Sequence, residues 1–213
     1  MILIFDLMDT LIRDPFFENF YFKLSDEQKK HWNQIKDHQV YKRFEEGKLL
    51  ENEYKNLSFK ENPKKYQLPD ISKMKKIMFR QIEFLKNTKE LFHFIQTNKQ
   101  KYSFVTILAS NYTVWYHEIF SVKKELEEWF DYVFFSCEVG IRKPDPDFFI
   151  LIHETVIKKL NLEKYHEVLY FDDCKENLDS ALSLSLGWRC IWISDKEKSS
   201  EIILNEIKNR THI

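Results

Sequence analysis

The sequence predicts an α/β protein in which a parallel, doubly wound sheet carries an inserted all-helical subdomain. Short apolar runs rich in β-branched and aromatic residues recur along the chain, and from residue 86 onward helical patterns separate them. One long stretch, residues 15–82, breaks this alternation because it carries no convincing strand. A chain of 213 residues can hold one core with an inserted subdomain, but not two large independent domains.

Five apolar runs are the predicted strands, because each is short and is bounded by polar residues. They span residues 2–5, 104–109, 133–135, 168–171 and 189–193. Runs without polar alternation are typical of strands buried on both faces of a parallel sheet. The polar residues after them are therefore expected at the carboxyl edge of the sheet, where open α/β sheets bind ligands.

Helical patterns fill the intervals between these strands. In the core they cover about 86–99, 113–129, 145–160 and 176–186, the last with Gly187 as its C-cap. In the inserted stretch they cover 16–24, 26–45, 50–60 and 70–84, which indicates about four helices. The charged region from Lys196 to Asn209 predicts a solvated C-terminal helix.

Composition argues against several classes of function. Lys+Arg 33 against Asp+Glu 34 gives a net charge of -1, which disfavours a dedicated nucleic-acid binder. The 3 glycines lie too far apart for a dinucleotide fingerprint or a P-loop, and the 3 cysteines form no C-x-x-C pair that would indicate a zinc site. The chain shows neither a basic leader nor an apolar run of about 18 residues. We therefore expect a soluble cytoplasmic protein without nucleic-acid or membrane partners.

Residues whose side chains can take part in catalysis or ligand binding follow the predicted strands. They are Asp6 with Thr10, Ser110 with Asn111, Lys143 before Pro144, and Asp172 with Asp173. An aspartate that ends a buried strand can act as a nucleophile when a cation offsets its charge, and an Asp-Asp pair offers the hard oxygen ligands that suit Mg²⁺. A serine can hold a phosphoryl oxygen, and a lysine can balance its charge.

The segments that carry these residues resemble the haloacid dehalogenase superfamily of hydrolases. They are FDLMDTL (5–11), ILASN (107–111), GIRKPDP (140–146) and YFDDCKENLDSA (170–181), in the family's order and spacing. The resemblance covers about 1–14 and 86–195. It implies a Rossmann-like core, residues 1–14 and 86–213, and a helical cap, residues 15–85, that closes over the site and selects the substrate.

The resemblance also implies roles for single residues. Asp6 is the nucleophile and Thr10 supports its loop, while Ser110, Asn111 and Lys143 bind the phosphoryl group. Mg²⁺ is then held by Asp6, the backbone carbonyl of Met8 and Asp172, with Asp173 assisting in the outer shell.

The first segment departs from the family pattern at the acid/base position. Phosphatases of the family carry Asp-x-Asp-x-Thr, in which the second aspartate protonates the leaving alcohol and later activates water. Here Met8 takes that position and Asp9 comes one residue late. Methionine cannot transfer a proton. Asp9 can replace the missing acid only by bending inward, because a one-residue shift in an extended segment sends a side chain to the opposite side.

Two groups of the family also lack the second aspartate, and they indicate which reactions are possible without it. In the 2-haloacid dehalogenases the fourth motif lacks an acidic pair, so Asp172-Asp173 argues against halide release. Certain sugar-phosphate phosphatases keep an acidic fourth motif with a following Asn, as in Asn177 here. We therefore predict a Mg²⁺-dependent phosphatase of small phosphorylated metabolites, a monomer or homodimer, that forms an aspartyl-phosphate on Asp6. Loss of the acid slows such an enzyme by about 10²- to 10⁴-fold, and less for good leaving groups.

Simpler roles compete with these assignments. The alternative function is a noncatalytic protein that binds a phosphorylated ligand or a partner. Ser110 and Asn111 can cap the following helix, and Asn177 is either an orienting residue for the acidic pair or an exposed helical residue. Arg13 and Asp14, at the entry to the inserted subdomain, are expected to be salt-bridged hinge residues that can also reach the substrate.

Overall fold

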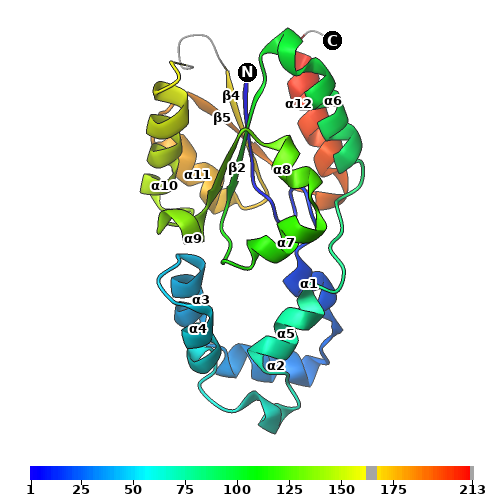
Figure 1. Cartoon of the computed structure of the whole chain (residues 1–213), viewed down its shortest axis with the longest axis vertical. Coiled ribbons are helices and arrows are strands. Elements are labelled where there is room, and N and C mark those ends of the chain that lie inside the picture. The colour runs from blue at the N-terminus through cyan, green and yellow to red at the C-terminus, as the bar shows by residue number, and fades with distance from the viewer. Residues whose placement is uncertain (162–166, 212–213) are drawn as a thin grey trace.

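The computed structural model describes residues 1–161 and 167–211, and shows a parallel sheet with a helical cap at one end (Figure 1). The strands are β1 (Ile2–Phe5), β2 (Val105–Ser110), β3 (Tyr132–Phe135), β4 (Val168–Asp172) and β5 (Trp188–Trp192). They lie in the order β3-β2-β1-β4-β5, and every neighbouring pair is parallel. The predicted α/β class is confirmed. Because β1 lies between β2 and β4, the residues that follow these three strands meet at one edge of the sheet.

Helices cover both faces of the sheet (Figure 1). On one face lie α6 (Thr88–Tyr102) and α12 (Ser199–Thr211), and on the other lie α10 (Pro146–Ile152) and α11 (Lys175–Ser183). Side chains of β1 alternate between two buried apolar clusters, Leu3 and Phe5 in one, Ile2 and Ile4 in the other. The prediction of a strand buried on both faces is thus confirmed for β1.

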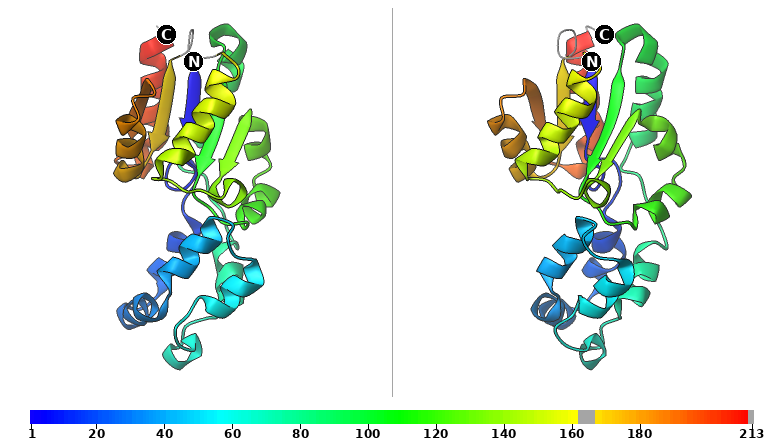
Figure 2. Two further views of the ribbon diagram at one scale, coloured as in Figure 1. Left: turned by 90° about the vertical axis from the view of Figure 1, so that its left-hand side faces the viewer. Right: turned by 60° about the vertical axis from the view of Figure 1, so that its left-hand side comes forward.

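The cap contains α1 (Pro15–Asn19), α2 (Asp26–Ile35), α3 (His38–Glu45), α4 (Glu51–Leu57) and α5 (Ile71–Met78), with short 3-10 turns at Tyr21–Lys23 and Pro63–Tyr66. The turned views in Figure 2 show it beyond one end of the sheet. The predicted helix over 26–45 is wrong, since the chain is extended at Lys36 and Asp37, and the Asp37 carboxylate caps α3. Among the described residues between β1 and β2 there is no strand, only isolated bridges.

Three predicted helices of the core differ from the structure. The pattern over 113–129 gives two helices, α7 (Tyr116–Val122) and α8 (Glu125–Trp129), which break at Lys123 (φ -115°, ψ 67°). The pattern over 145–160 gives α10 followed by a π-helical turn at His153–Lys158. A short helix before it, α9 (Ser136–Val139), was not predicted. Gly187 is not the C-cap of α11, because that helix ends at Ser183 and Leu184 is its C-cap.

The C-terminal helix is only partly solvated. A 3-10 turn at Lys196–Lys198 precedes α12, which buries Ile203 and Ile207 in the same apolar cluster as Leu3. No helix among the described residues has the length and apolar character needed to cross a bilayer.

Contacts at two places help to hold the cap against the core. At its root, the Leu85 N–H donates to the Leu11 carbonyl at 2.9 Å. At its far side, the Arg142 guanidinium lies 2.6 Å from Glu45 of α3, and the Ser136 hydroxyl donates to the Glu45 carbonyl at 2.6 Å. Gly47 passes so close to the core that an added Cβ would lie 2.2 Å from the Cys137 carbonyl oxygen. These contacts fix the cap over the carboxyl edge of the sheet.

Candidate active site

A buried charged cluster lies at the carboxyl ends of β1 and β4. The Nζ of Lys143 is 2.8 Å from Oδ1 of Asp6 and 2.6 Å from Oδ2 of Asp172, and the three side chains are 1%, 8% and 0% exposed respectively. Burial raises the pKa of Asp6 to about 6, although the Lys143 ammonium opposes this shift. Burial also disfavours the charged form of Lys143, but the two carboxylates outweigh it and raise the pKa of Lys143 above its usual range. Lys143 therefore stays charged between two acids.

Four groups orient the carboxylate of Asp172. The Asn177 amide donates to both oxygens, at 3.1 and 3.0 Å, and the Cys174 N–H donates to Oδ1 at 2.8 Å. The Tyr170 hydroxyl and the Lys143 ammonium both donate to Oδ2. Asn177 is buried, so the structure favours an orienting role for it over that of an exposed helical residue.

Three hydroxyls at or after the ends of β1 and β2 have no hydrogen-bond partner within the described part of the chain. They belong to Ser110, which ends β2, to Thr10 and to Tyr112, and all three residues are buried. Buried polar groups are rarely left unpaired, so an unpaired hydroxyl at a ligand-binding edge suggests that a bound group completes its hydrogen bonding. Ser110 and Tyr112 line the cavity over Asp6, whereas Thr10 does not.

Asn111 fixes the segment that carries Lys143. Its amide donates to the Lys143 carbonyl at 2.8 Å, and its Oδ1 accepts from the Lys143 N–H at 2.7 Å. The side chain thus makes positioning contacts, while a direct contact of Asn111 with a substrate stays a prediction.

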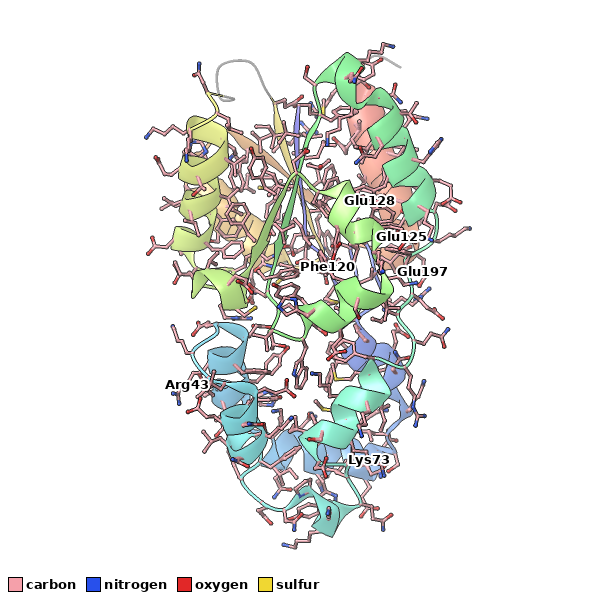
Figure 3. All side chains as sticks on the ribbon, in the orientation of Figure 1. Arg43, Lys73, Phe120, Glu125, Glu128 and Glu197 are labelled. Carbon is pink, nitrogen blue, oxygen red and sulfur yellow. The ribbon has the colours of Figure 1, made fainter. Side chains whose placement is uncertain are left out.

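Asp9 faces the root of the cap. Its Oδ1 accepts from the Asp14 N–H and from the Lys196 ammonium, each at 3.2 Å. Met8, not Asp9, lines the cavity over Asp6. Arg13 is the expected salt-bridged hinge residue, 2.7 Å from Glu197, which Figure 3 labels.

Asp14 has a different position from Arg13, because it lines the cavity over Asp6. Its Oδ1 accepts from the Phe16 N–H at 2.8 Å and so caps α1. Desolvation raises the pKa of Asp14 to about 7, and the nearby charge of Asp9 adds to the shift. No ion pair holds its carboxylate within residues 1–161 and 167–211. The sequence placed Asp14 at the hinge, but only the fold turns it toward the cavity.

The cavity over Asp6 has a volume of about 390 Å³ and is closed partly by cap residues. A second cavity, of about 410 Å³, lies between the cap helices and the core residues Tyr112, Thr113 and Trp115. The two share lining residues, which are Asp14, Phe17, Tyr41, Glu45 and Tyr112. The two cavities therefore adjoin at these side chains.

The oxygen donors at this edge suit Mg²⁺. Asp6, Asp172 and Asp173 supply carboxylates, the ligands that Mg²⁺ prefers. Desolvation and the charges of Asp6 and Asp172 raise the pKa of Asp173 to about 7, and a bound cation relieves such repulsion. The described residues contain no group of three His, Cys, Asp or Glu side chains arranged to hold a metal ion. The donor chemistry fits a divalent cation, and in this structure Lys143 supplies the balancing charge between Asp6 and Asp172.

Comparison with known proteins finds chains similar to this one. Flavin mononucleotide hydrolase 1, a chloroplast protein of Arabidopsis thaliana, is 28% identical over 196 residues, which are 91% of this chain and 73% of that protein. The enzyme BT-2542 of Bacteroides thetaiotaomicron, solved with magnesium and inorganic phosphate, has a TM-score of 0.61 at 17% identity and covers 90% of this chain and 92% of its own. Magnesium-bound YfnB of Bacillus subtilis has a TM-score of 0.62 at 15% identity and covers 100% and 98%.

These structural likenesses establish the fold. The family model of haloacid dehalogenase-like hydrolases matches residues 1–184, which include all four segments described above. The chain belongs to the haloacid dehalogenase-like hydrolase family.

Proposed function

We propose that this protein is a Mg²⁺-dependent phosphatase of small phosphate monoesters that forms an aspartyl-phosphate on Asp6. The observation that carries the proposal is the buried cluster of Asp6, Lys143 and Asp172 beside the unpaired hydroxyl of Ser110. This cluster combines a nucleophile, a fixed positive charge and a free hydrogen-bond donor in a cavity of substrate size.

The phosphoryl group is held by Lys143 and Ser110, which donate to its oxygens. Asp6 attacks phosphorus, the bond to the leaving oxygen breaks, and water then hydrolyses the aspartyl-phosphate. Mg²⁺, held by Asp6, the Met8 carbonyl and Asp172 with Asp173 in the outer shell, would reduce the repulsion between the nucleophile and the phosphate. Asn177 keeps the oxygens of Asp172 in place for this role.

Asp14 is our candidate for the proton transfer that Met8 cannot perform. The leaving oxygen joins the phosphoryl group to the rest of the substrate, so it lies where the two cavities meet. Two carboxyl groups line that boundary, and Arg142 holds one of them, Glu45, at 2.6 Å. With a pKa of about 7, Asp14 can protonate the leaving oxygen and then accept a proton from the attacking water. Asp9, held by Lys196, is the weaker candidate.

In this proposal the substrate is a small phosphorylated metabolite. The cytoplasmic location and the monomeric or homodimeric state stay predictions. Because the Arabidopsis relative is named for the hydrolysis of flavin mononucleotide, that ester is the first to test. A noncatalytic, ligand-binding protein is the second candidate, and the observation that favours it is Met8 at the acid/base position.

The test is phosphate release from flavin mononucleotide, glucose 1-phosphate and p-nitrophenyl phosphate, with Mg²⁺ or with a chelator. Asp6→Asn is compared with wild type and with Asp70→Asn, a matched change at an exposed helix cap. We expect Mg²⁺-dependent release that falls by at least about 10³-fold in Asp6→Asn only. If no ester is hydrolysed although phosphate binds, the noncatalytic function replaces the proposal.

A further inference from the structure

The second cavity, called the cap cavity below, is lined mainly by aromatic rings. Trp32, Tyr54 and Trp115 are buried in its wall, and Tyr41 joins it to the cavity over Asp6. Its volume of about 410 Å³ lies within the range of small-molecule sites, about 300–1,000 Å³. Aromatic walls favour a flat ring, which stacks on or packs edge-on against them.

One cation lies in this aromatic wall without an acidic partner. Lys36 is 6% exposed, and its Nζ makes its one side-chain hydrogen bond to the Tyr54 hydroxyl at 2.8 Å. The same ammonium lies 4.4 Å from the centre of the Tyr54 ring and 5.7 Å from that of Tyr41. Within the described ranges no carboxylate forms an ion pair with Lys36. The negative charge that acts on it is that of its chain neighbour Asp37, which caps α3.

An ammonium has three N–H donors, so the bond to Tyr54 leaves Lys36 with unused donors beside the cavity. Burial of an unpaired ammonium is unfavourable, and here it lowers the pKa of Lys36 to about 7. A ligand that brings an acceptor atom to Lys36 removes this penalty. Two further polar residues of the cavity wall, Asn33 and His38, are exposed, and Asn33 is paired with Tyr21.

We propose that the cap cavity binds a planar heteroaromatic ring in the leaving group of the substrate, and that Lys36 donates to an electron-rich oxygen or nitrogen on the edge of that ring. The proposal rests on the phosphatase function, since the ring is placed by the ester link to the phosphate held at Lys143. Its ligand class is the phosphate monoester of an alcohol attached to such a ring. Simple sugar phosphates lack the ring and are not expected to use Lys36.

Binding without phosphate tests this site separately from catalysis. Riboflavin and pyridoxine, two ring-bearing alcohols, and ribitol, which has no ring, are titrated by calorimetry. The variants are Lys36→Met, which keeps the length of the side chain, and Lys36→Arg, which keeps the charge. Lys73→Met, at an exposed lysine of α5 that Figure 3 labels, is the matched control.

We expect wild type and Lys73→Met to bind at least one ring-bearing alcohol and not ribitol. A hydrogen bond to a charged donor corresponds to about 10- to 100-fold in affinity, so Lys36→Met should weaken ring binding by that factor and Lys36→Arg by less. In turnover, Lys36→Met should raise KM for the phosphorylated ring compound by the same factor and leave KM for glucose 1-phosphate unchanged.

The proposal is wrong if neither ring compound binds wild type, or if Lys36→Met binds them as tightly. It is also wrong if Lys36→Met raises KM for both esters alike, since a purely structural role predicts that result. Thermal unfolding of Lys36→Met establishes that the variant is folded. Failure of the phosphatase function is recognised separately, because Asp6→Asn with p-nitrophenyl phosphate does not involve Lys36.

Discussion

Replacing Asp14 with asparagine separates its structural contact from its proposed chemistry. Asparagine keeps a side-chain oxygen that can accept from the Phe16 N–H, so the hydrogen bond that caps the N-terminus of helix α1 is retained. The substitution removes only the proton that Asp14 gives to the leaving oxygen. Asp70→Asn makes the same change at the cap of α5, away from both shared cavities, and serves as the control.

The expected loss depends on the leaving group. General acid catalysis contributes about 10²- to 10⁴-fold, or about 3–5 kcal/mol of barrier. Flavin mononucleotide has an alkoxide leaving group that needs the proton, so kcat/KM should fall by this full factor. The p-nitrophenolate ion leaves without a proton, and its ester should lose less than about tenfold.

The assay is kcat/KM for both esters between pH 5 and 9. Because the acid must be protonated for the first step, wild-type kcat/KM for flavin mononucleotide should fall as pH rises through about 7, the pKa of Asp14. Asp14→Asn should remove this falling limb. Equal losses for the two esters, or an unchanged pH profile, would refute the assignment of Asp14 as the acid.

Three further predictions concern Met8, Gly47 and Lys36. Met8→Asp should raise kcat for flavin mononucleotide less than about tenfold, because Asp14 already transfers the proton; a larger rise would show that wild type has no acid. Gly47→Ala should destabilise the protein in urea unfolding by about 1–3 kcal/mol more than Gly140→Ala, since both have positive φ but only at Gly47 does the added Cβ meet the backbone of Cys137; equal losses would contradict this contact. Lys36→Met should raise the free energy of unfolding relative to wild type, and this difference should be largest at pH 7 and below. The pKa of Lys36 falls from 10.5 unfolded to about 7 folded, so wild type gains stability as pH rises between these values and the difference from the variant should shrink; a difference constant from pH 7 to 10 would rule out a buried, destabilised ammonium.

The strands and the charged cluster were predictable from the sequence because both depend on local pattern. Continuous apolar runs mark buried parallel strands, and the residues after β1, β2 and β4 meet wherever those strands are neighbours. Asp6, Ser110 and Asp172 were placed correctly at the carboxyl edge for this reason. Their proposed roles still await the experiments above.

The helix breaks at Lys36 and Lys123 were not predictable, because neither position carries a glycine or proline. Tertiary contacts accompany the break at Lys36, which joins an isolated bridge with Phe59 and whose ammonium lies in the aromatic wall of the cap cavity. Lys36 was missed as a cavity residue for the same physical reason, whereas Asp14 was predicted as a hinge residue within reach of the substrate. A lone charged residue in a polar segment has no periodic signal, and its burial depends on residues far away in the chain.

The contact between Glu45 and Arg142 bears on how this protein can evolve. Arg142 directly precedes Lys143, so the same short segment anchors the cap and supplies the charge beside Asp6. Substitutions along α1 and α2 can reshape the cap cavity for another leaving group without touching that segment. Substitutions at the end of α3 cannot, because they change the support of the Lys143 loop as well. New specificities should therefore arise in α1 and α2, while the Glu45-to-Gly47 corner stays constant.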